Sequence, residues 1–168
     1  DTTAPTANFT KANDNVGTVR GDFTSDNTTD DTALVLSGTN ESGSSVKVYD
    51  NSTELGTATA ESTTSWSYSA TVANGTTHLF NVRETDLAGN TSAATSNLAV
   101  TGDTTAPTAN FTKANDNVGT VRGDFTSDNT TDDTALVLSG TNESGSSVKV
   151  YDNSTELGAA TVSGTSWS

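Results

Sequence analysis

The chain of 168 residues has no cysteine, no methionine, two prolines and only 7 lysine and arginine residues together. Without cysteine the fold has no disulfide, and no thiolate is present as a nucleophile or a metal ligand. So few cations cannot form the basic patch that a nucleic-acid surface needs or that an anionic membrane attracts. No apolar run approaches the roughly 18 residues of a membrane-spanning helix. These absences argue against nucleic-acid binding, membrane insertion and thiol chemistry.

What the chain has in excess is acid: 21 Asp and Glu residues give a formal net charge of -14, and hydrophobic residues make up 30%. Low hydrophobicity with high net charge is typical of disordered chains. Here, however, apolar residues alternate regularly with polar ones and the acids gather at turns, which indicates a folded protein. No signal peptide is recognisable, and we expect the chain to be an internal segment of a longer protein.

The strongest feature of the sequence is an internal repeat. Residues 1–56 recur without a single change at residues 103–158, a period of 102 residues. A period of this length corresponds to one whole domain per copy rather than to one coil of a solenoid. Near-identical neighbours are typical of a spacer, whose length is copy number times repeat length, and an active site rarely needs them.

The two copies differ in extent. Residues 159–168 follow residues 57–67 with one residue fewer, and Trp167 takes the place of Trp66. Half a sandwich exposes sheet edges, which leaves open whether the second copy is incompletely ordered or completed by a neighbouring chain. The predicted domains are a complete copy, residues 1–102, and a truncated second copy without strands F and G, residues 103–168.

The secondary structure follows from a period of two. No segment has helical periodicity, and apolar residues alternate with polar ones. Residues 11–32 are expected to be a long polar connection, and residues 51–56 a turn with Leu55 tucked inward. About seven short strands in about 100 residues predict an all-β, immunoglobulin-like (Ig-like) β-sandwich, repeated in tandem. The predicted strands of one copy are residues 7–10, 33–39, 45–50, 57–60, 65–72, 78–84 and 96–101.

Five motifs together resemble one family of proteins. They are DTTAPT at the start of both copies, LSGTNESG at 36–43, VKVYDNSTELG at 46–56, WSY at 66–68 and TDLAGNTS at 85–92. In this order, and at a period of 102 residues, they resemble the bacterial Ig-like repeats of large, type I-secreted surface adhesins, known as RTX or biofilm-associated adhesins. The resemblance implies a stalk of many Ig-like modules on the bacterial cell surface, with calcium held at loops and at linkers between modules.

The acidic loops fit calcium chemically. Ca²⁺ takes about six to eight oxygen ligands from carboxylates, carbonyls, amides and water. Clustered carboxylates repel one another, so a cation that binds only the folded form stabilises it. The candidate metal ligands are Asp1, Asp14, Asp30, Asp31, Glu41, Asp86, Asp103, Asp116 and Glu143. The alternative is that these acids are ordinary solvated turn residues, and neither an EF-hand loop nor the nonapeptide calcium repeat is present.

An Ig-like topology sorts these acids by the two ends of the sandwich. Glu41 and Asp86 are expected at the pole where the chain enters, and residues 14–31 largely at the opposite pole, where it leaves. A linker-associated site is then expected at the junction of two modules. Its ligands are the acids of the first copy's residues 14–31, together with Asp103 and Glu143.

Catalytic constellations have little support in this sequence. The single histidine, His78, is expected to be a surface residue rather than a base. Asp30 and Asp31 are neighbours in extended chain, so they point to opposite faces, unlike a glycosidase pair. Trp66 and Tyr68 share a face with core positions and are expected to pack in the core rather than to form a sugar platform. We therefore expect no enzyme.

The sequence as a whole predicts a calcium-rigidified extender segment of a cell-surface adhesin, whose partners are neighbouring identical repeats and which projects a distal binding domain. Pro5 and Pro107 each follow Ala and keep the linkers extended. The alternative is an Ig-like module that itself binds a carbohydrate, ice or a host protein. No nucleic acid, membrane insertion or small-molecule substrate is expected.

Overall fold

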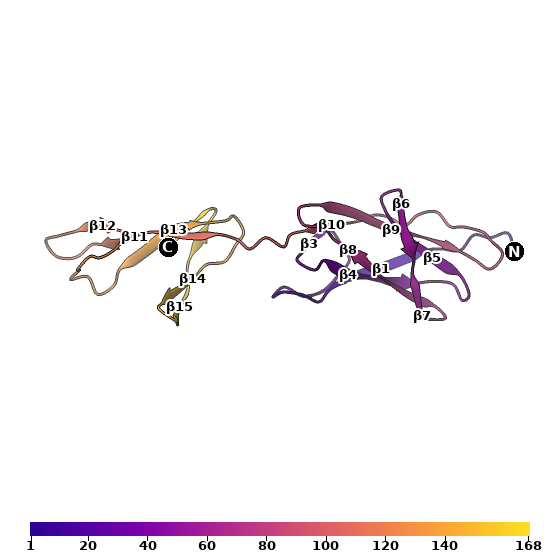
Figure 1. Ribbon diagram of the computed structural model, residues 1–168, viewed down its shortest axis with the longest axis horizontal. Helices are drawn as coiled ribbons and strands as arrows, with labels where there is room; N and C mark the ends of the chain where they lie inside the picture. Colours follow the sequence, from indigo (N-terminus) through magenta and orange to yellow (C-terminus); the bar gives the residue numbers. More distant parts are fainter. The chain divides into compact units, whose positions relative to one another are not determined.

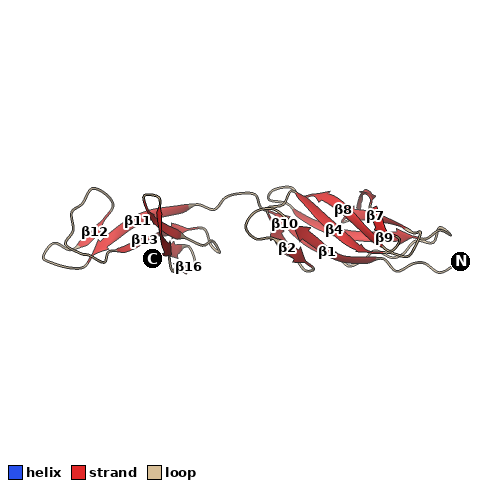
Figure 2. Ribbon diagram, turned by 90° about the horizontal axis from the view of Figure 1, so that it is seen from below, coloured by secondary structure: helices blue, strands red, loops and turns tan.

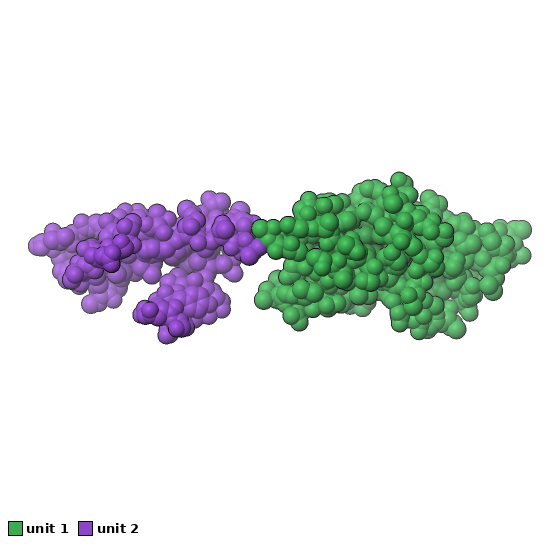
Figure 3. All heavy atoms as spheres, viewed as in Figure 1, with its two compact units in different colours: residues 1–105 green, residues 106–168 purple.

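The computed structural model describes all residues, 1–168, as β-strands and loops without any helix. It therefore has no helix of the length and apolarity needed to cross a membrane. The chain divides into two compact units, residues 1–105 and 106–168 (Figure 3). Each unit has its own sheets and its own buried residues.

The first sheet of the first unit has the strand order β2-β1-β4-β8-β7 and is antiparallel throughout (Figure 2). On β4, Leu34 and Leu36 are fully buried while Val35 between them is partly exposed, which is the alternation of a strand with one face in the core. The strands are β1 (Asn8–Asp14), β2 (Gly21–Phe23), β4 (Ala33–Thr39), β7 (Thr59–Ser62) and β8 (Ser65–Thr71).

The second sheet packs against the first and has the order β3-β10-β9-β5-β6 (Figure 1). β3 runs parallel to β10, and the other neighbours are antiparallel. On β5, Val46 and Val48 are buried between exposed Lys47 and partly exposed Tyr49. The strands are β3 (Asn27–Thr29), β5 (Ser45–Asp50), β6 (Thr53–Thr57), β9 (Thr77–Thr85) and β10 (Leu98–Gly102).

The core of the first unit is one cluster of apolar side chains from both sheets. Phe80 and Val82 of β9 and Leu36 of β4 are fully buried in this cluster, and Trp66 of β8 is 2% exposed. Burying one such side chain stabilises the fold by about 1.5–3 kcal/mol relative to leaving it in water. The Ig-like sandwich predicted from the period of two is thereby confirmed, as is the core position of Trp66.

A close approach of backbones explains a glycine in this core. A Cβ at Gly38 would collide with the carbonyl oxygen of Asn8 on β1 and with the indole of Trp66. The indole Nε1 donates a hydrogen bond to that same Asn8 oxygen at 3.3 Å. The bulky ring therefore fits beside β1 only because position 38 has no side chain.

Two short strands lie where a polar connection was expected. The first strand, β1, continues beyond the predicted residue 10 to Asp14, and β2 pairs with its second half, Ala12 lying opposite Phe23. β3 (Asn27–Thr29) then joins the edge of the other sheet beside β10. β3 is entirely polar and β2 has one apolar side chain, Phe23, so the period-two signal is too weak to reveal these three-residue strands.

The prediction of a turn over residues 51–56 is wrong for most of its length. Asn51 and Ser52 form a two-residue loop, since Asp50 pairs with Thr53, and β6 begins there. Asn51 has a φ of 55°, the left-handed conformation that asparagine tolerates in tight hairpin turns. Leu55 was expected to tuck inward but is 39% exposed, because β6 is the outer edge of its sheet.

The second unit repeats the first sheet and part of the second. Its sheet has the order β12-β11-β13-β17-β16, and a separate hairpin joins β14 to β15. β14 pairs with β15 alone, whereas β5 pairs with both β6 and β9, and Tyr151 on β14 is 53% exposed. Phe111 on β11 is 52% exposed. The strands are β11 (Ala109–Asp116), β12 (Gly123–Phe125), β13 (Val137–Asn142), β14 (Lys149–Asp152), β15 (Thr155–Ala159), β16 (Val162–Ser163) and β17 (Ser166–Trp167).

Candidate functional site

The loops at the amino-terminal end of the first unit come together with the start of the chain. The Asn90 side chain donates a hydrogen bond to the Asp1 carbonyl at 3.3 Å. Leu87 packs over Gly43, so the loop after β9 touches the loop between β4 and β5. Asp1, Glu41 and Asp86 therefore share one end of the sandwich, which we call the amino-terminal pole. The topology had predicted this end for them.

Asp86 is held by its own loop. Its Oδ1 accepts a hydrogen bond from the Asn90 backbone N–H and its Oδ2 accepts one from the Asn90 side-chain amide, each at 2.8 Å. The Asn90 side chain is the main reason that the pKa of Asp86 lies below its ordinary value of 3.8, with backbone N–H groups of the loop adding to the effect. The carboxylate is thus preorganised and ionised at neutral pH.

Glu84, which sequence reasoning missed, is the most buried acid at this pole. It lies on β9 at 0% exposure. Its Oε1 accepts hydrogen bonds from the Glu41 backbone N–H at 2.6 Å and from the Ser44 hydroxyl at 2.5 Å, while its Oε2 has no partner. The alternation of apolar residues along β9 was the available signal, because position 84 falls on the inward face with Phe80 and Val82.

A second acidic cluster is buried within the connection between β1 and β4. Asp14 is 5% exposed and Asp31 is 2% exposed. Thr29 joins them: its hydroxyl donates to Asp14 Oδ2 at 2.7 Å and accepts from the Asp31 N–H at 3.0 Å. The backbone N–H groups of Val16 and Ala33 donate to the Oδ1 atoms, at 3.0 Å to Asp14 and 2.8 Å to Asp31. These carboxylates therefore organise the connection through hydrogen bonds to its backbone and to Thr29.

The acids of this connection differ in whether their side chains face the solvent or the interior. Asp30 is exposed while its neighbour Asp31 is buried, which confirms that the two point to opposite faces. In the second unit Asp116 takes the part of Asp14, with its Oδ2 accepting from the Thr131 hydroxyl at 2.6 Å and Asp133 buried beside it. The arrangement is therefore a property of the repeated sequence and does not depend on a complete sandwich.

The residues that leave the first unit are tied to it at the opposite end, the carboxy-terminal pole. The Asp103 N–H donates to the Thr29 carbonyl at 2.8 Å, and its Oδ1 accepts from the Thr105 N–H at 3.0 Å. Asn74, in the turn after β8, accepts from the Thr104 N–H at 2.8 Å and donates to the Thr105 hydroxyl at 3.2 Å. Asp103 thus serves a local turn, as Asp1 does toward Thr3.

Glu143 occupies in the second unit the place that Glu41 has in the first. Its backbone N–H donates to the Thr108 carbonyl at 3.3 Å, whereas the Glu41 N–H donates to the Glu84 carboxylate. The loop conformation is kept in both, since Ser146 and Ser44 each donate a backbone hydrogen bond to the glutamate carbonyl three residues earlier at 3.1 Å. The loop around the glutamate is therefore defined locally.

No three acidic or histidine side chains converge closely enough to hold a metal ion by themselves. The predicted ligands instead fall into separate groups, at the two poles of the first unit and in the second unit. At the amino-terminal pole, carboxylates lie beside amide and backbone oxygens, which is the mixed oxygen set that Ca²⁺ accepts. Two of these oxygens, Glu84 Oε2 and Asn40 Oδ1, are buried and have no partner, so the chemistry of this pole fits a hard cation.

The prediction that His78 is a surface residue is wrong. Its side chain is 14% exposed. Nδ1 donates to Asp50 Oδ2 at 2.8 Å, because Nε2 is already the acceptor for the Ala73 N–H at 3.2 Å. The ring also stacks on Phe80, with centroids 5.4 Å apart. His78 thus joins β9, β5 and the turn after β8.

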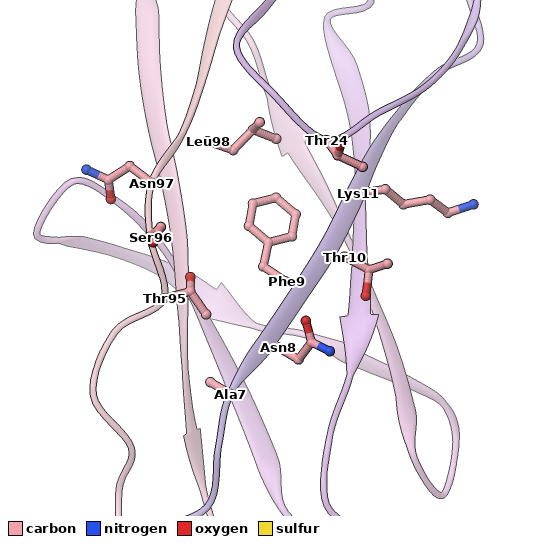
Figure 4. A pocket seen from close by; sticks show the side chains of 10 residues that line it. All are labelled: Ala7, Asn8, Phe9, Thr10, Lys11, Thr24, Thr95, Ser96, Asn97 and Leu98. Carbon is pink, nitrogen blue, oxygen red and sulfur yellow. The ribbon is translucent and has the colours of Figure 1, made fainter.

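A groove of about 340 Å³ runs between β1 and the segment leading into β10 (Figure 4). The Phe9 ring lies at its centre, between the two segments, and packs against Trp66 with centroids 5.9 Å apart. The rim is mainly hydroxyl and amide side chains. The lining residues are Ala7, Asn8, Phe9, Thr10, Lys11, Thr24, Thr95, Ser96, Asn97 and Leu98.

Comparison with known proteins assigns the chain to a family. Residues 2–104 match the bacterial Ig-like domain family. The chain therefore belongs to that family, as its motifs and its sandwich of two five-stranded sheets had indicated. No curated protein and no solved structure matches the chain. Bacterial Ig-like domains are typically non-catalytic and are often exposed at the cell surface.

Proposed function

We propose that this chain is an extender segment of a bacterial cell-surface adhesin, in which each Ig-like module adds length. The observation that carries the proposal lies within the first unit: Asp1 is held at the amino-terminal pole, and residues 102–105 are held at the opposite end (Figure 1). A module whose chain enters at one end and leaves at the other lengthens a stalk with every copy. The repeat of residues 1–56 at 103–158 fits that use.

Calcium is the second part of the proposal. The formal net charge is -14, and the acids form only four ion pairs, all of them with lysines and all of them exposed. Exposed pairs contribute little to stability, so most of the acid is uncompensated. A divalent cation at the amino-terminal pole, held by oxygens that include Glu41 and Asp86, stabilises the folded module by mass action and stiffens its loops. Extracellular modules bind calcium at about 10⁻⁴ to 10⁻³ M.

The partners that follow from this role are neighbouring copies of the same repeat, and the location is extracellular. Asp103 and the proline at position 107 belong to the sequence that joins one copy to the next. The hydrogen bonds between Asn74 and residues 104 and 105 support a short, ordered exit from the module. A stalk gains from such an exit because a floppy linker shortens its mean end-to-end distance.

The test uses a tandem of two copies of residues 1–102, measured by small-angle X-ray scattering and thermal melting in millimolar calcium and then in excess chelator. We expect a longer, stiffer particle and a higher Tm with calcium, and a matched magnesium sample separates a specific site from screening. Identical scattering profiles and melts in calcium and in chelator would remove calcium from the proposal and leave a plain spacer.

A second candidate function is direct ligand binding by the module, and the groove around Phe9 favours it. An aromatic ring flanked by hydroxyl and amide groups is suited to a carbohydrate, which stacks one face and hydrogen-bonds at its edges. A glycan array probed with the wild-type chain and with Phe9→Ala tests this. Binding that Phe9→Ala removes supports it, and an array without signal for the wild-type chain contradicts it.

A further inference from the structure

Glu84 and Asn40 each have a buried oxygen atom with no hydrogen-bond donor. Glu84 is completely buried, and no lysine, arginine or histidine pairs with it. A buried carboxylate without a compensating partner is costly, because it has left water without an equivalent charge or full set of hydrogen bonds. Oε1 is served by two donors from the loop between β4 and β5, but Oε2 has none.

The side-chain amide of Asn40 also has a buried oxygen without a partner. Asn40 Nδ2 donates to the Glu41 carbonyl at 2.8 Å and to the Ser44 hydroxyl at 3.3 Å. Because a carbonyl can only accept, this contact fixes the orientation of the amide and leaves Oδ1 as the buried atom without a partner. Ser44 is also a donor to Glu84, so both unpartnered oxygens belong to side chains gathered around one hydroxyl.

The second unit separates the contribution of the loop from that of Glu84. Asn142 makes the corresponding bonds, to the Glu143 carbonyl at 2.7 Å and to Ser146 at 3.3 Å, and its Oδ1 is likewise buried without a partner. There the Glu143 N–H donates to the Thr108 carbonyl at 3.3 Å and not to a carboxylate. The inward amide oxygen is therefore built by the local NESGS sequence, and Glu84 adds the charge beside it.

Two buried acceptors, on side chains that both contact Ser44, are without a donor. Water supplies donors but leaves the buried charge in place, whereas a cation supplies both charge and coordination. We propose that Glu84 Oε2 and Asn40 Oδ1 are the buried ligands of a calcium ion at the amino-terminal pole, which makes Glu84 the main determinant of calcium affinity in the first unit. The proposal rests on the proposed function only for the identity of the cation. It adds two residues that the acidic-loop pattern did not contain.

Glu84→Gln is a sharp test because it keeps the shape and removes the charge. In chelator, the new side chain carries no buried charge, while its oxygen still accepts from Glu41 and Ser44. We therefore expect Glu84→Gln to melt at a higher temperature than the wild-type chain in chelator and to gain little from calcium. Isothermal titration of the 168-residue chain with calcium chloride should show affinity weakened by at least about tenfold.

A matched pair of variants distinguishes a loss of calcium binding from a folding defect. Asn40→Ala and Asn142→Ala remove the same local hydrogen bonds in the first and second units, so a loss of Tm in chelator is expected from both. Only Asn40→Ala should weaken calcium binding, since Asn142 has no Glu84 beside it. Near-ultraviolet circular dichroism checks that each variant folds.

Three outcomes are distinguishable. Weakened calcium binding in Glu84→Gln and Asn40→Ala, with Asn142→Ala unchanged, supports the proposal. Calcium binding of equal affinity and stoichiometry in the wild type and Glu84→Gln overturns it but leaves the calcium part of the proposed function standing. Absence of calcium binding in the wild-type chain overturns both.

Discussion

In this protein the environment of an acidic residue depends more on whether its side chain faces the core or the solvent than on its residue type. Asp30 and Asp31 are identical side chains one position apart, yet one is exposed and the other is 2% exposed. Likewise the carboxylate of Asp86 is set by Asn90 of its own loop, whereas Glu84, two residues earlier, faces the core. The acids of a repeat this rich in them therefore have quite different energetic roles.

At the residue scale, Asn90→Ala should raise the pKa of Asp86 toward 3.8, because the Asn90 side chain is the largest cause of its depression. A carboxyl with a lowered folded-state pKa contributes stability above its unfolded value, and this is lost as pH falls through the folded value. The variant should therefore be less stable than the wild type at pH 7, and the difference should shrink below about pH 4. Carboxyl NMR titration in chelator measures the pKa. An unchanged Asp86 titration would contradict the assignment.

At the element scale, turns between strands tie the sheets to the residues that follow them. The turn after β8 accepts the Gly102 N–H through Thr76 at 3.0 Å and donates to the Gly102 carbonyl through Gly75 at 2.7 Å. Its Asn74 side chain then holds residues 104 and 105. A Cβ at Gly102 would meet Ala73, so the turn and the end of β10 are in close backbone contact. The exit from the module is thus part of its fold.

Asn74→Ala should release this exit without unfolding the sandwich. Removing the side chain takes away the acceptor for the Thr104 N–H and the donor to the Thr105 hydroxyl. We expect lower heteronuclear NOE values at residues 104 and 105, with the values of β9 unchanged. Thr77→Val is the control, because it removes only the hydroxyl pair with Thr101 at the same pole. Equal NOE values in the two variants would show that Asn74 does not order the exit.

At the scale of the whole molecule, the same sequence sits in two different environments. Leu36 is fully buried in the first unit, whereas its repeat counterpart Leu138 is only partly buried in the second. The difference arises because β9 and β10 cover the first sheet of the first unit, and the second unit has no equivalent strands. The Phe9 counterpart, Phe111, is 52% exposed for the same reason.

Leu36→Ala should therefore destabilise the first unit by about 2–5 kcal/mol, and Leu138→Ala should cost the chain less. The chain has two tryptophans, one in each unit, so Trp167→Phe leaves Trp66 as the sole reporter of the first unit. In urea titrations followed by its fluorescence, Leu36→Ala should shift the transition strongly. Leu138→Ala should leave it within about 0.5 kcal/mol, since distant sites add independently. A large shift from Leu138→Ala would mean that the units unfold as one.

The sequence predicted strands most accurately where one face of the strand is buried and the other is exposed to solvent. The strands predicted at residues 33–39 and 45–50 are β4 and β5 with the same bounds, because Leu34, Leu36, Val46 and Val48 alternate cleanly. It missed β2, β3 and β6, which lie at or near sheet edges and carry few buried side chains. An edge strand is defined by its hydrogen bonds to a neighbour, and no pattern of hydrophobicity records those bonds.

The candidate site was likewise only partly predictable from the sequence. The acids themselves and their sorting between two poles followed from composition and topology, as Asp1, Glu41 and Asp86 illustrate. Glu84 did not, because in the sequence it is one more polar residue of β9. Likewise, His78 was expected at the surface, but β5 and the turn after β8 enclose it through Asp50 and Ala73.

The sequence by itself determined the repeat, the all-β class, the family and the acidic character, because these depend on periodicity, composition and motifs that lie along the chain. Only the tertiary structure decided which acids are buried and which oxygens lack a partner. Those properties depend on residues distant in sequence, such as Glu84 of β9, which accepts hydrogen bonds from Glu41 and Ser44, 43 and 40 residues away. Burial and electrostatic compensation arise from packing in three dimensions, and no local pattern encodes them.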